Sequence, residues 1–260
     1  MPKAVTNLVV GVSTRTINLT WLRQSDHKAS YSYLVIALQD AKMVQNGSTQ
    51  VENYTFTDLT PGTLYTFDVF TVVEGVRSEV ESTSNYTEPE SATDITAIGG
   101  TTTMTVSWTQ AVGEVGSYTI LLYKGTMLVR NATNLSNTTV KKEFLNLTPG
   151  VLYCVEVMTK SGPYEIANPP VCNATFPTPP GSIEVESQTV ESINFTWGLP
   201  NGMDHNQYNF SVSTFNGSFL TGNNWFLLDK LQSGSPYSIS VVTVGVKNYE
   251  STAVTTQKFT

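Results

Sequence analysis

One stretch of the form Leu-x-x-Gly-x-x-Tyr occurs three times, and this repeat constrains the fold more than any other feature. The copies span 59–65, 147–153 and 231–237. The Tyr of each copy lies 40 to 45 residues after a Trp that closes an alternating run. These tryptophans are Trp21, Trp108 and Trp197. One structural unit is therefore written three times along the chain.

Alternation of apolar and polar residues predicts that each unit is built of β-strands. Ile17, Leu19 and Trp21 share one face of their stretch, while Asn18 and Thr20 share the other. A period of two is typical of a half-buried strand, and no segment shows a sustained helical period. Many short strands separated by Gly, Pro and Asn turns predict an all-β chain of two-sheet antiparallel sandwiches.

The same strands are expected in every unit. In unit one we place them near 5–10, 16–22, 31–38, 51–57, 64–73 and 78–85. The third of these stretches begins at a tyrosine in each unit, namely Tyr33, Tyr118 and Tyr208. We expect each unit to close as a seven-stranded sandwich.

These motifs together resemble a fibronectin type III repeat, and the resemblance covers the whole chain. It implies that the Trp is buried between the sheets and that the Tyr after Pro-Gly forms a tyrosine corner, with its hydroxyl bonded back to the chain. Unit three departs from the pattern, because Ser233 replaces Pro and Pro236 precedes the Tyr. The core residues implied are Trp21, Tyr65, Trp108, Tyr153, Trp197 and Tyr237.

The repeat divides the 260 residues into unit one (1–88), unit two (89–177) and unit three (178–260). Both junctions are short and contain proline, which favours an extended rod over freely tumbling units. The net charge of −7 divides as −3, −1 and −3, so no unit is basic. Nucleic acid and heparin-like polyanions are therefore not expected partners.

The first residues contain no apolar core of a signal peptide, and no apolar run is long enough to cross a bilayer. We expect no membrane contact by the segment itself. We interpret the chain as an internal part of a longer secreted or membrane protein.

Twelve of the nineteen asparagines lie in the sequence Asn-x-Ser/Thr, which is the acceptor for N-linked glycans. The alternative is that a Thr-rich β protein produces this pattern by chance, although chance would place only about five asparagines in this context. The strand period predicts that Asn18, Asn53, Asn194 and Asn209 point to water, as a glycan requires. The predicted sites are Asn18, Asn46, Asn53, Asn85, Asn131, Asn134, Asn137, Asn146, Asn173, Asn194, Asn209 and Asn216.

Unit two differs in where these sites fall. Asn131, Asn134 and Asn137 are expected to gather in one loop region, which leaves its broad strand faces less shielded. We therefore expect a protein partner to contact the sheet face around Tyr123 or the last hairpin of this unit. A pure spacer is the alternative.

Cys154 and Cys172 are centred on residue 163, where Gly162-Pro163 is expected to turn the last hairpin of unit two. Directly opposed residues on antiparallel strands lie within the distance that a disulfide accepts, so we predict a Cys154–Cys172 disulfide. The alternative is a pair of free buried thiols, which the outward phase of Cys154 disfavours.

No constellation for catalysis, metal binding or cofactor binding is found in the sequence. The two histidines, His27 and His205, lie in polar stretches of different units. They cannot form a metal cluster or a Ser-His-Asp arrangement within one domain. We expect both to be solvated loop residues, and we expect no cofactor and no catalytic site.

The short repeats, the dense glycosylation sites and a cysteine directly after the corner Tyr resemble the ectodomains of receptor-type protein tyrosine phosphatases of the eta, beta and H kind. This resemblance implies a non-catalytic extracellular segment of a cell-surface receptor, which binds an extracellular protein or cell-surface partner or acts as a glycosylated spacer. A full-length protein of that kind carries a cytoplasmic phosphatase domain. The alternatives are a matrix or adhesion protein of the tenascin and fibronectin type, and an accessory module of a secreted enzyme.

Overall fold

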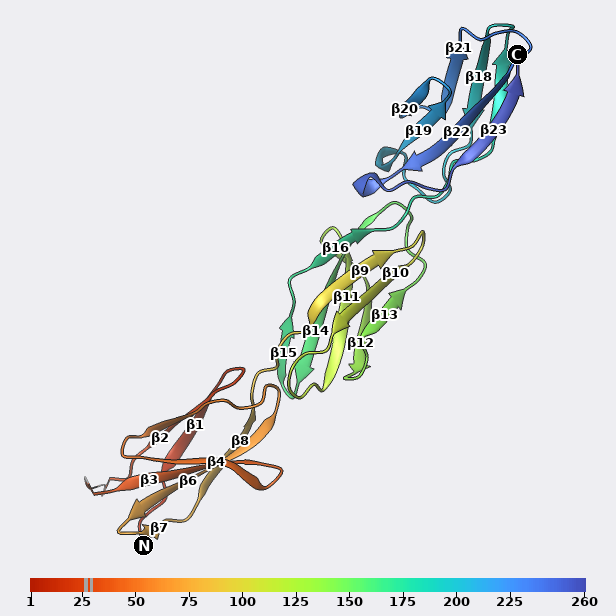
Figure 1. Cartoon of the computed structure of the whole chain (residues 1–260). Coiled ribbons are helices and arrows are strands. Elements are labelled where there is room, and N and C mark those ends of the chain that lie inside the picture. Colours follow the sequence, from red (N-terminus) through yellow and green to blue (C-terminus); the bar gives the residue numbers. More distant parts are fainter. Residues whose placement is uncertain (26–27, 29) are drawn as a thin grey trace.

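The computed structural model describes residues 1–25, 28 and 30–260, and it contains three β-sandwiches joined end to end. Figure 1 shows them as an extended rod with the two termini at opposite ends. His27 lies outside the described residues. The all-β tandem architecture predicted from the repeat is confirmed.

Unit one packs two antiparallel sheets, with strand orders β1-β2-β5 and β4-β3-β6-β7, and β8 also pairs with β6. Its strands are β1 (Thr6–Val12), β2 (Ile17–Leu22), β3 (Ser32–Gln39), β4 (Lys42–Thr49), β5 (Asn53–Phe56), β6 (Leu64–Val73), β7 (Val76–Arg77) and β8 (Glu81–Tyr86).

Unit two repeats this arrangement, with strand orders β13-β10-β9 and β12-β11-β14-β15, and β16 also pairs with β14. Its strands are β9 (Thr93–Gly99), β10 (Met104–Thr109), β11 (Ser117–Lys124), β12 (Met127–Ser136), β13 (Lys141–Phe144), β14 (Leu152–Ser161), β15 (Tyr164–Ala167) and β16 (Val171–Ala174).

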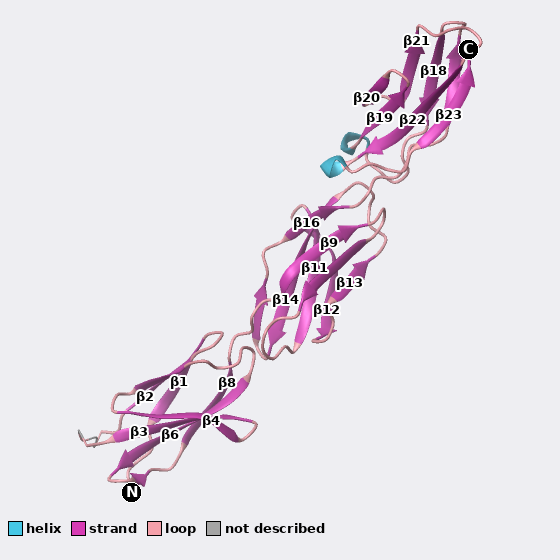
Figure 2. Ribbon diagram, in the orientation of Figure 1, coloured by secondary structure: helices cyan, strands magenta, loops and turns pink. Residues whose placement is uncertain are grey.

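Unit three has strand orders β17-β18-β21 and β20-β19-β22-β23. Its strands are β17 (Ile183–Gln188), β18 (Ser192–Trp197), β19 (Asn209–Thr214), β20 (Gly217–Thr221), β21 (Trp225–Asp229), β22 (Pro236–Val244) and β23 (Val254–Phe259). Two single turns of 3₁₀ helix, η1 (His205–Gln207) and η2 (Val246–Asn248), lie at the end that faces unit two (Figure 2). These turns were not predicted, because each is too short to carry a period.

Each unit has its own hydrophobic core around its Trp. The three tryptophans are 3–5% exposed, as predicted. Each indole packs edge-on against an aromatic ring of the next strand, a geometry that contributes about 0.5–1.5 kcal/mol beyond area burial. The pairs are Trp21–Tyr33, Trp108–Tyr118 and Trp197–Phe210.

All three tyrosine corners form, including the one in unit three that lacks Pro-Gly. In each corner the Tyr hydroxyl accepts a hydrogen bond from the backbone N–H five residues upstream. The pairs are Thr60 to Tyr65 at 3.0 Å, Thr148 to Tyr153 at 3.0 Å and Gln232 to Tyr237 at 2.7 Å. Tyr65 and Tyr153 are buried, whereas Tyr237 is half-buried.

The sequence pattern missed the short strands β7 and β15 and one longer strand in each unit. The longer ones are the edge strands β4, β12 and β20, and most of their residues are exposed. A strand that buries neither face has no reason to alternate apolar and polar residues, so its sequence reads as a loop. Among the described residues, units one and two have eight strands each instead of the expected seven, because the short strands β7 and β15 form beside β6 and β14, and unit three has seven.

No helix within the described part of the chain is long and apolar enough to cross a membrane. Those same residues contain no group of three or more His, Cys, Asp or Glu side chains that is placed to hold a metal ion. His205 is exposed at the start of η1, and its ring lies beside Tyr208.

Candidate functional site

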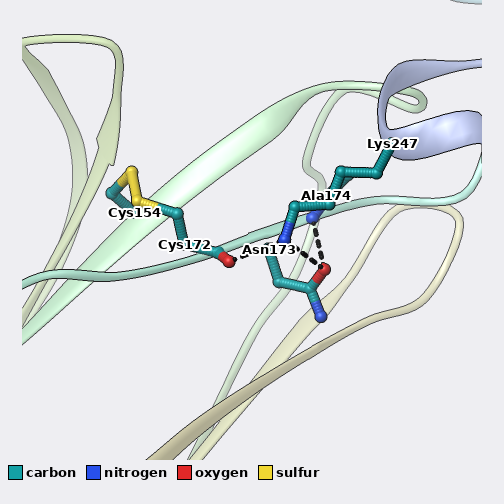
Figure 3. The surroundings of a disulfide bond; sticks show 5 residues. All are labelled: Cys154, Cys172, Asn173, Ala174 and Lys247. Carbon is teal, nitrogen blue, oxygen red and sulfur yellow. Dashed lines mark hydrogen bonds between the residues drawn. A yellow bond between two sulfur atoms is a disulfide. The ribbon is translucent and has the colours of Figure 1, made fainter.

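The last hairpin of unit two carries the one covalent cross-link of the described residues. Cys154 on β14 lies directly opposite Cys172 on β16, and their sulfurs form a disulfide (Figure 3). Tyr153 and Val155 beside it point into the core, so the disulfide sits on the outer face of the sheet. It ties a short edge strand to the central strand of the sandwich.

A shallow groove of about 420 Å³ runs beside this disulfide. Its walls come from the outward residues of β11 and β14, from the turn between β11 and β12, and from the segment that leads into β16. They are Tyr123, Gly125, Thr126, Cys154, Glu156, Pro170 and Cys172. The groove therefore combines an aromatic ring, a carboxylate and a rigid cross-linked edge.

Tyr123 and Glu156 form the polar pair of this groove. The Tyr123 hydroxyl donates to a Glu156 carboxylate oxygen at 3.5 Å, across neighbouring strands. Burial and the adjacent carboxylate raise the pKa of Tyr123. The pair gives the groove one hydroxyl donor and one carboxylate acceptor.

A larger cleft of about 800 Å³ opens where units two and three meet. It shares Gly125 and Cys154 with the groove, so the two hollows lie next to each other. Unit three contributes residues of η1, η2 and the start of β19, including His205 and Asn209. The sequence pattern missed this contribution, because it depends on how one unit is placed on the next.

Most predicted glycosylation sites lie on the surface. Three of the twelve are less exposed than the rest, because they are half-buried and their side chains form hydrogen bonds. They are Asn85, Asn173 and Asn194. The nine exposed asparagines are Asn18, Asn46, Asn53, Asn131, Asn134, Asn137, Asn146, Asn209 and Asn216. Occupancy of all twelve sites stays a prediction.

Several of these sites follow the edge strands. Asn46 lies on β4, and Asn131 and Asn134 lie on β12, while Asn137 follows β12 directly. The expectation that the three sites of unit two share one loop is therefore wrong for Asn131 and Asn134. Bulky glycans on an exposed edge strand would hinder its pairing with another chain.

Asn194 does not point freely into water as its strand phase predicted. Its amide Nδ2 donates to a Glu186 carboxylate oxygen at 2.7 Å. The pairing of β17 with β18 shifts register between Val185 and Ser187. This irregularity at Glu186 brings the carboxylate over Asn194.

The groove lies on the outer face of β11 and β14. Neither of these two strands contains a predicted glycosylation site. Asn131 on the neighbouring β12 pairs with Leu121, two residues before Tyr123, so it borders this face. Tyr123 pairs directly with Cys154, so the two contact regions that the sequence analysis gave as alternatives lie side by side.

Comparison with known proteins identifies the domain family of unit one and relatives of the chain. Residues 3–85 match the fibronectin type III domain family. The chain is 28% identical over 241 residues to receptor-type tyrosine-protein phosphatase eta of Gallus gallus, a match that covers 90% of this chain and 17% of that protein. It is 24% identical over 200 residues to tenascin-R of Gallus gallus, covering 75% of this chain and 15% of that protein.

Among solved structures, a segment of two fibronectin type III domains from chicken tenascin aligns with 65% of this chain and 97% of that chain. The identity is 20% and the TM-score is 0.48. The chain spans about a sixth of the length of the two curated relatives named above. Residues 3–85 match the fibronectin type III family, and units two and three repeat the buried Trp and the tyrosine corner of unit one, so the chain folds as three tandem sandwiches of this kind and is similar in sequence to receptor-type tyrosine-protein phosphatase eta.

Proposed function

We propose that this chain is a non-catalytic extracellular segment of a cell-surface receptor of the receptor-type tyrosine-protein phosphatase kind, where it binds a protein partner or acts as a glycosylated spacer. One observation carries the proposal: similarity to phosphatase eta extends over 90% of this chain but only 17% of that protein. Under this proposal the three sandwiches correspond to a non-catalytic part of such a receptor, and its catalytic region would lie outside the match.

The segment itself catalyses nothing under this proposal. A tyrosine phosphatase needs a nucleophilic cysteine in a His-Cys-x-x-Gly-x-Gly-Arg loop, and a thiolate is the reactive form. Here Cys154 follows Tyr153 and Cys172 follows Val171, and the two sulfurs are joined in a disulfide. Purified protein is expected to show no hydrolysis of a phosphotyrosine peptide; turnover that co-purifies with the chain through successive columns would contradict this.

An extracellular role predicts N-glycans at the exposed sites. When the chain is directed through the secretory pathway of a mammalian host, glycopeptide mass spectrometry should find sugar on Asn46 and Asn131, whose side chains are exposed on edge strands. Enzymatic removal of N-glycans should increase the mobility of the protein on a gel. The Asn46→Gln variant should lose only its own glycan, and secreted protein without any glycan would argue against an extracellular role.

The groove of unit two is the proposed contact surface for a protein partner. Its wall is cross-linked, and a pre-ordered surface loses less conformational entropy on binding. Cells plated on a surface coated with the segment should attach through it. Tyr123→Ser should weaken attachment about tenfold if this ring anchors the contact.

The matched control for that experiment is Ile98→Ser. Ile98 is an exposed apolar residue on β9, in the other sheet of the same unit. It should leave attachment unchanged. Equal losses of attachment in both variants would show that the contact does not depend on the groove. If the segment supports no more attachment than an albumin-coated surface, the spacer role is favoured.

A segment of an extracellular matrix or adhesion protein is the second candidate, because the similarity to tenascin-R extends over 75% of this chain. The complete protein sequence distinguishes the two. A membrane-spanning helix followed by a phosphatase domain supports the receptor, whereas further repeats without a membrane span support the matrix protein.

A further inference from the structure

The two joints of the rod use the same pair of residue types. At the first joint, the Tyr164 hydroxyl from the last hairpin of unit two donates to the Asn85 side-chain oxygen at 3.2 Å. At the second, the Tyr249 hydroxyl from the equivalent loop of unit three donates to the Asn173 side-chain oxygen at 2.8 Å. Each Asn lies near the end of the last strand of its unit. Both joints therefore share one contact, in which a tyrosine of the following unit donates to an asparagine of the preceding unit.

The second joint has additional contacts. Lys247 reaches across from η2 and donates to the Cys172 carbonyl oxygen at 3.0 Å (Figure 3). The Tyr249 ring stacks on Phe176 with centroids 4.8 Å apart. The Asn173 amide Nδ2 donates to the Ala97 carbonyl oxygen at 2.7 Å, so both ends of this side chain are bonded.

A glycine of the tyrosine corner completes each joint. Gly62 and Gly150 both have φ near +66°, and a Cβ on either would collide with the following unit. The colliding group at the first joint is the backbone carbonyl oxygen of Glu114, whereas at the second it is the end of the flexible Met203 side chain, which can shift more easily. Gly234, the same position in unit three, has nothing within 4 Å. The close approach therefore belongs to the joints and not to the corner itself.

The threonine of each Asn-x-Thr sequence at a joint is also used structurally. Thr87 and Thr175 are fully buried. Their hydroxyls donate to the carbonyl oxygens of Thr60 and Thr148 at 2.7 and 2.8 Å, which ties the last strand to the tyrosine corner. This structural role accounts for the threonine of the two Asn-x-Thr sequences even if their asparagines carry no glycan.

Unit three separates the two roles. Thr260 makes the equivalent bond to the Gln232 carbonyl oxygen at 2.7 Å, so the threonine tie is present in every unit. Lys258 occupies the place that Asn85 and Asn173 occupy in the other units. The asparagine is therefore present only in the two units that are followed by another unit. The threonine is present in all three.

We propose that Asn85 and Asn173 are docking residues that latch each unit to the hairpin tyrosine of the next, and that they carry no glycan in the aligned rod. The partner of this surface is a second fibronectin type III unit that presents a tyrosine from its last hairpin. A glycan is bulky and needs an exposed asparagine, whereas these two side chains are half-buried between units.

The latch is tested by amide hydrogen exchange on unglycosylated protein from a bacterial host with its disulfide formed. The Glu114 N–H donates to the Pro61 carbonyl oxygen at 2.9 Å across the first joint, so its exchange reports opening of that joint. Tyr164→Phe removes only the latching hydroxyl and should speed exchange at Glu114 roughly fivefold. Tyr249→Phe makes the same change at the other joint and should leave Glu114 unaffected.

For the second joint, Tyr249→Ala removes both the hydrogen bond and the stack on Phe176, and it should broaden the range of maximum dimensions seen in small-angle scattering. Unchanged Glu114 exchange in Tyr164→Phe together with unchanged scattering from Tyr249→Ala would overturn the latch.

The absence of glycans at the joints rests on the proposed extracellular function and is tested separately. Glycopeptide mapping of protein from a secretory host should find Asn85 and Asn173 unmodified, with Asn46 and Asn131 modified. Sugar on Asn85 in molecules whose Glu114 amide stays protected would overturn this part. If Asn46 and Asn131 are also bare, the proposed extracellular function fails, while the exchange result decides the latch by itself.

Discussion

Replacement of Trp197 by alanine is expected to lower the free energy of unfolding of unit three by about 3–5 kcal/mol. The side chain is 3% exposed, and its indole packs edge-on against Phe210 at 5.4 Å between ring centroids. Truncation removes this packing and leaves a cavity between the two sheets. The measurement is denaturant unfolding of the full chain, followed by backbone NMR signals assigned to each unit.

Trp225→Ala is the matched control for this prediction. Trp225 lies on β21 of the same unit but is 48% exposed, so its removal should cost well under half as much. Signals of units one and two should keep their midpoints in both variants, because each unit has a separate core. Equal destabilisation by the two substitutions would show that Trp197 is not the centre of the core.

Removal of the disulfide by the double substitution Cys154→Ala and Cys172→Ala is expected to destabilise unit two by about 3 kcal/mol. The cross-link closes a short loop, with the two cysteines 18 positions apart in sequence, and it lowers the entropy of the unfolded chain. Both cysteines are replaced so that no free thiol remains. Unfolding followed by signals of unit two should show a lower midpoint.

Chemical reduction of the unmodified protein is the independent check on that result. Reduction should lower the unfolding midpoint of unit two by a similar amount. It should leave the midpoints of units one and three unchanged, because those units contain no cysteine. An unchanged midpoint for unit two in the double variant would mean that the strand pairing alone holds the hairpin.

The core was predictable because it depends on local alternation. Residues such as Ile17, Leu19 and Trp21 must share a face in any strand, so a period of two specifies the buried side wherever one face is covered. The tyrosine corners were equally accessible, since their donor lies five residues from the Tyr in the chain. The disulfide followed from the symmetry of the two cysteines about one turn.

Surface features were predicted less well, because a neighbouring strand can alter them. The phase argument was right for Asn18, Asn53 and Asn209, which are exposed. For Asn194 it gave the correct face, opposite the buried Ile193 and Phe195, but the register shift of the adjacent strand brings Glu186 over the side chain and leaves it half-buried. Edge strands such as β12 were missed because a strand that covers no core carries no periodic signal.

The sequence alone therefore specified three sandwiches, their cores, their corners and their cross-link, because each of these follows from residues close along the chain or repeated between units. Tertiary structure decided which asparagines are free and how the units meet. Asn85 and Tyr164 are 79 residues apart, and Asn173 and Tyr249 are 76 apart. No local period links such residues, and only the placement of one folded unit on the next brings them within hydrogen-bonding distance.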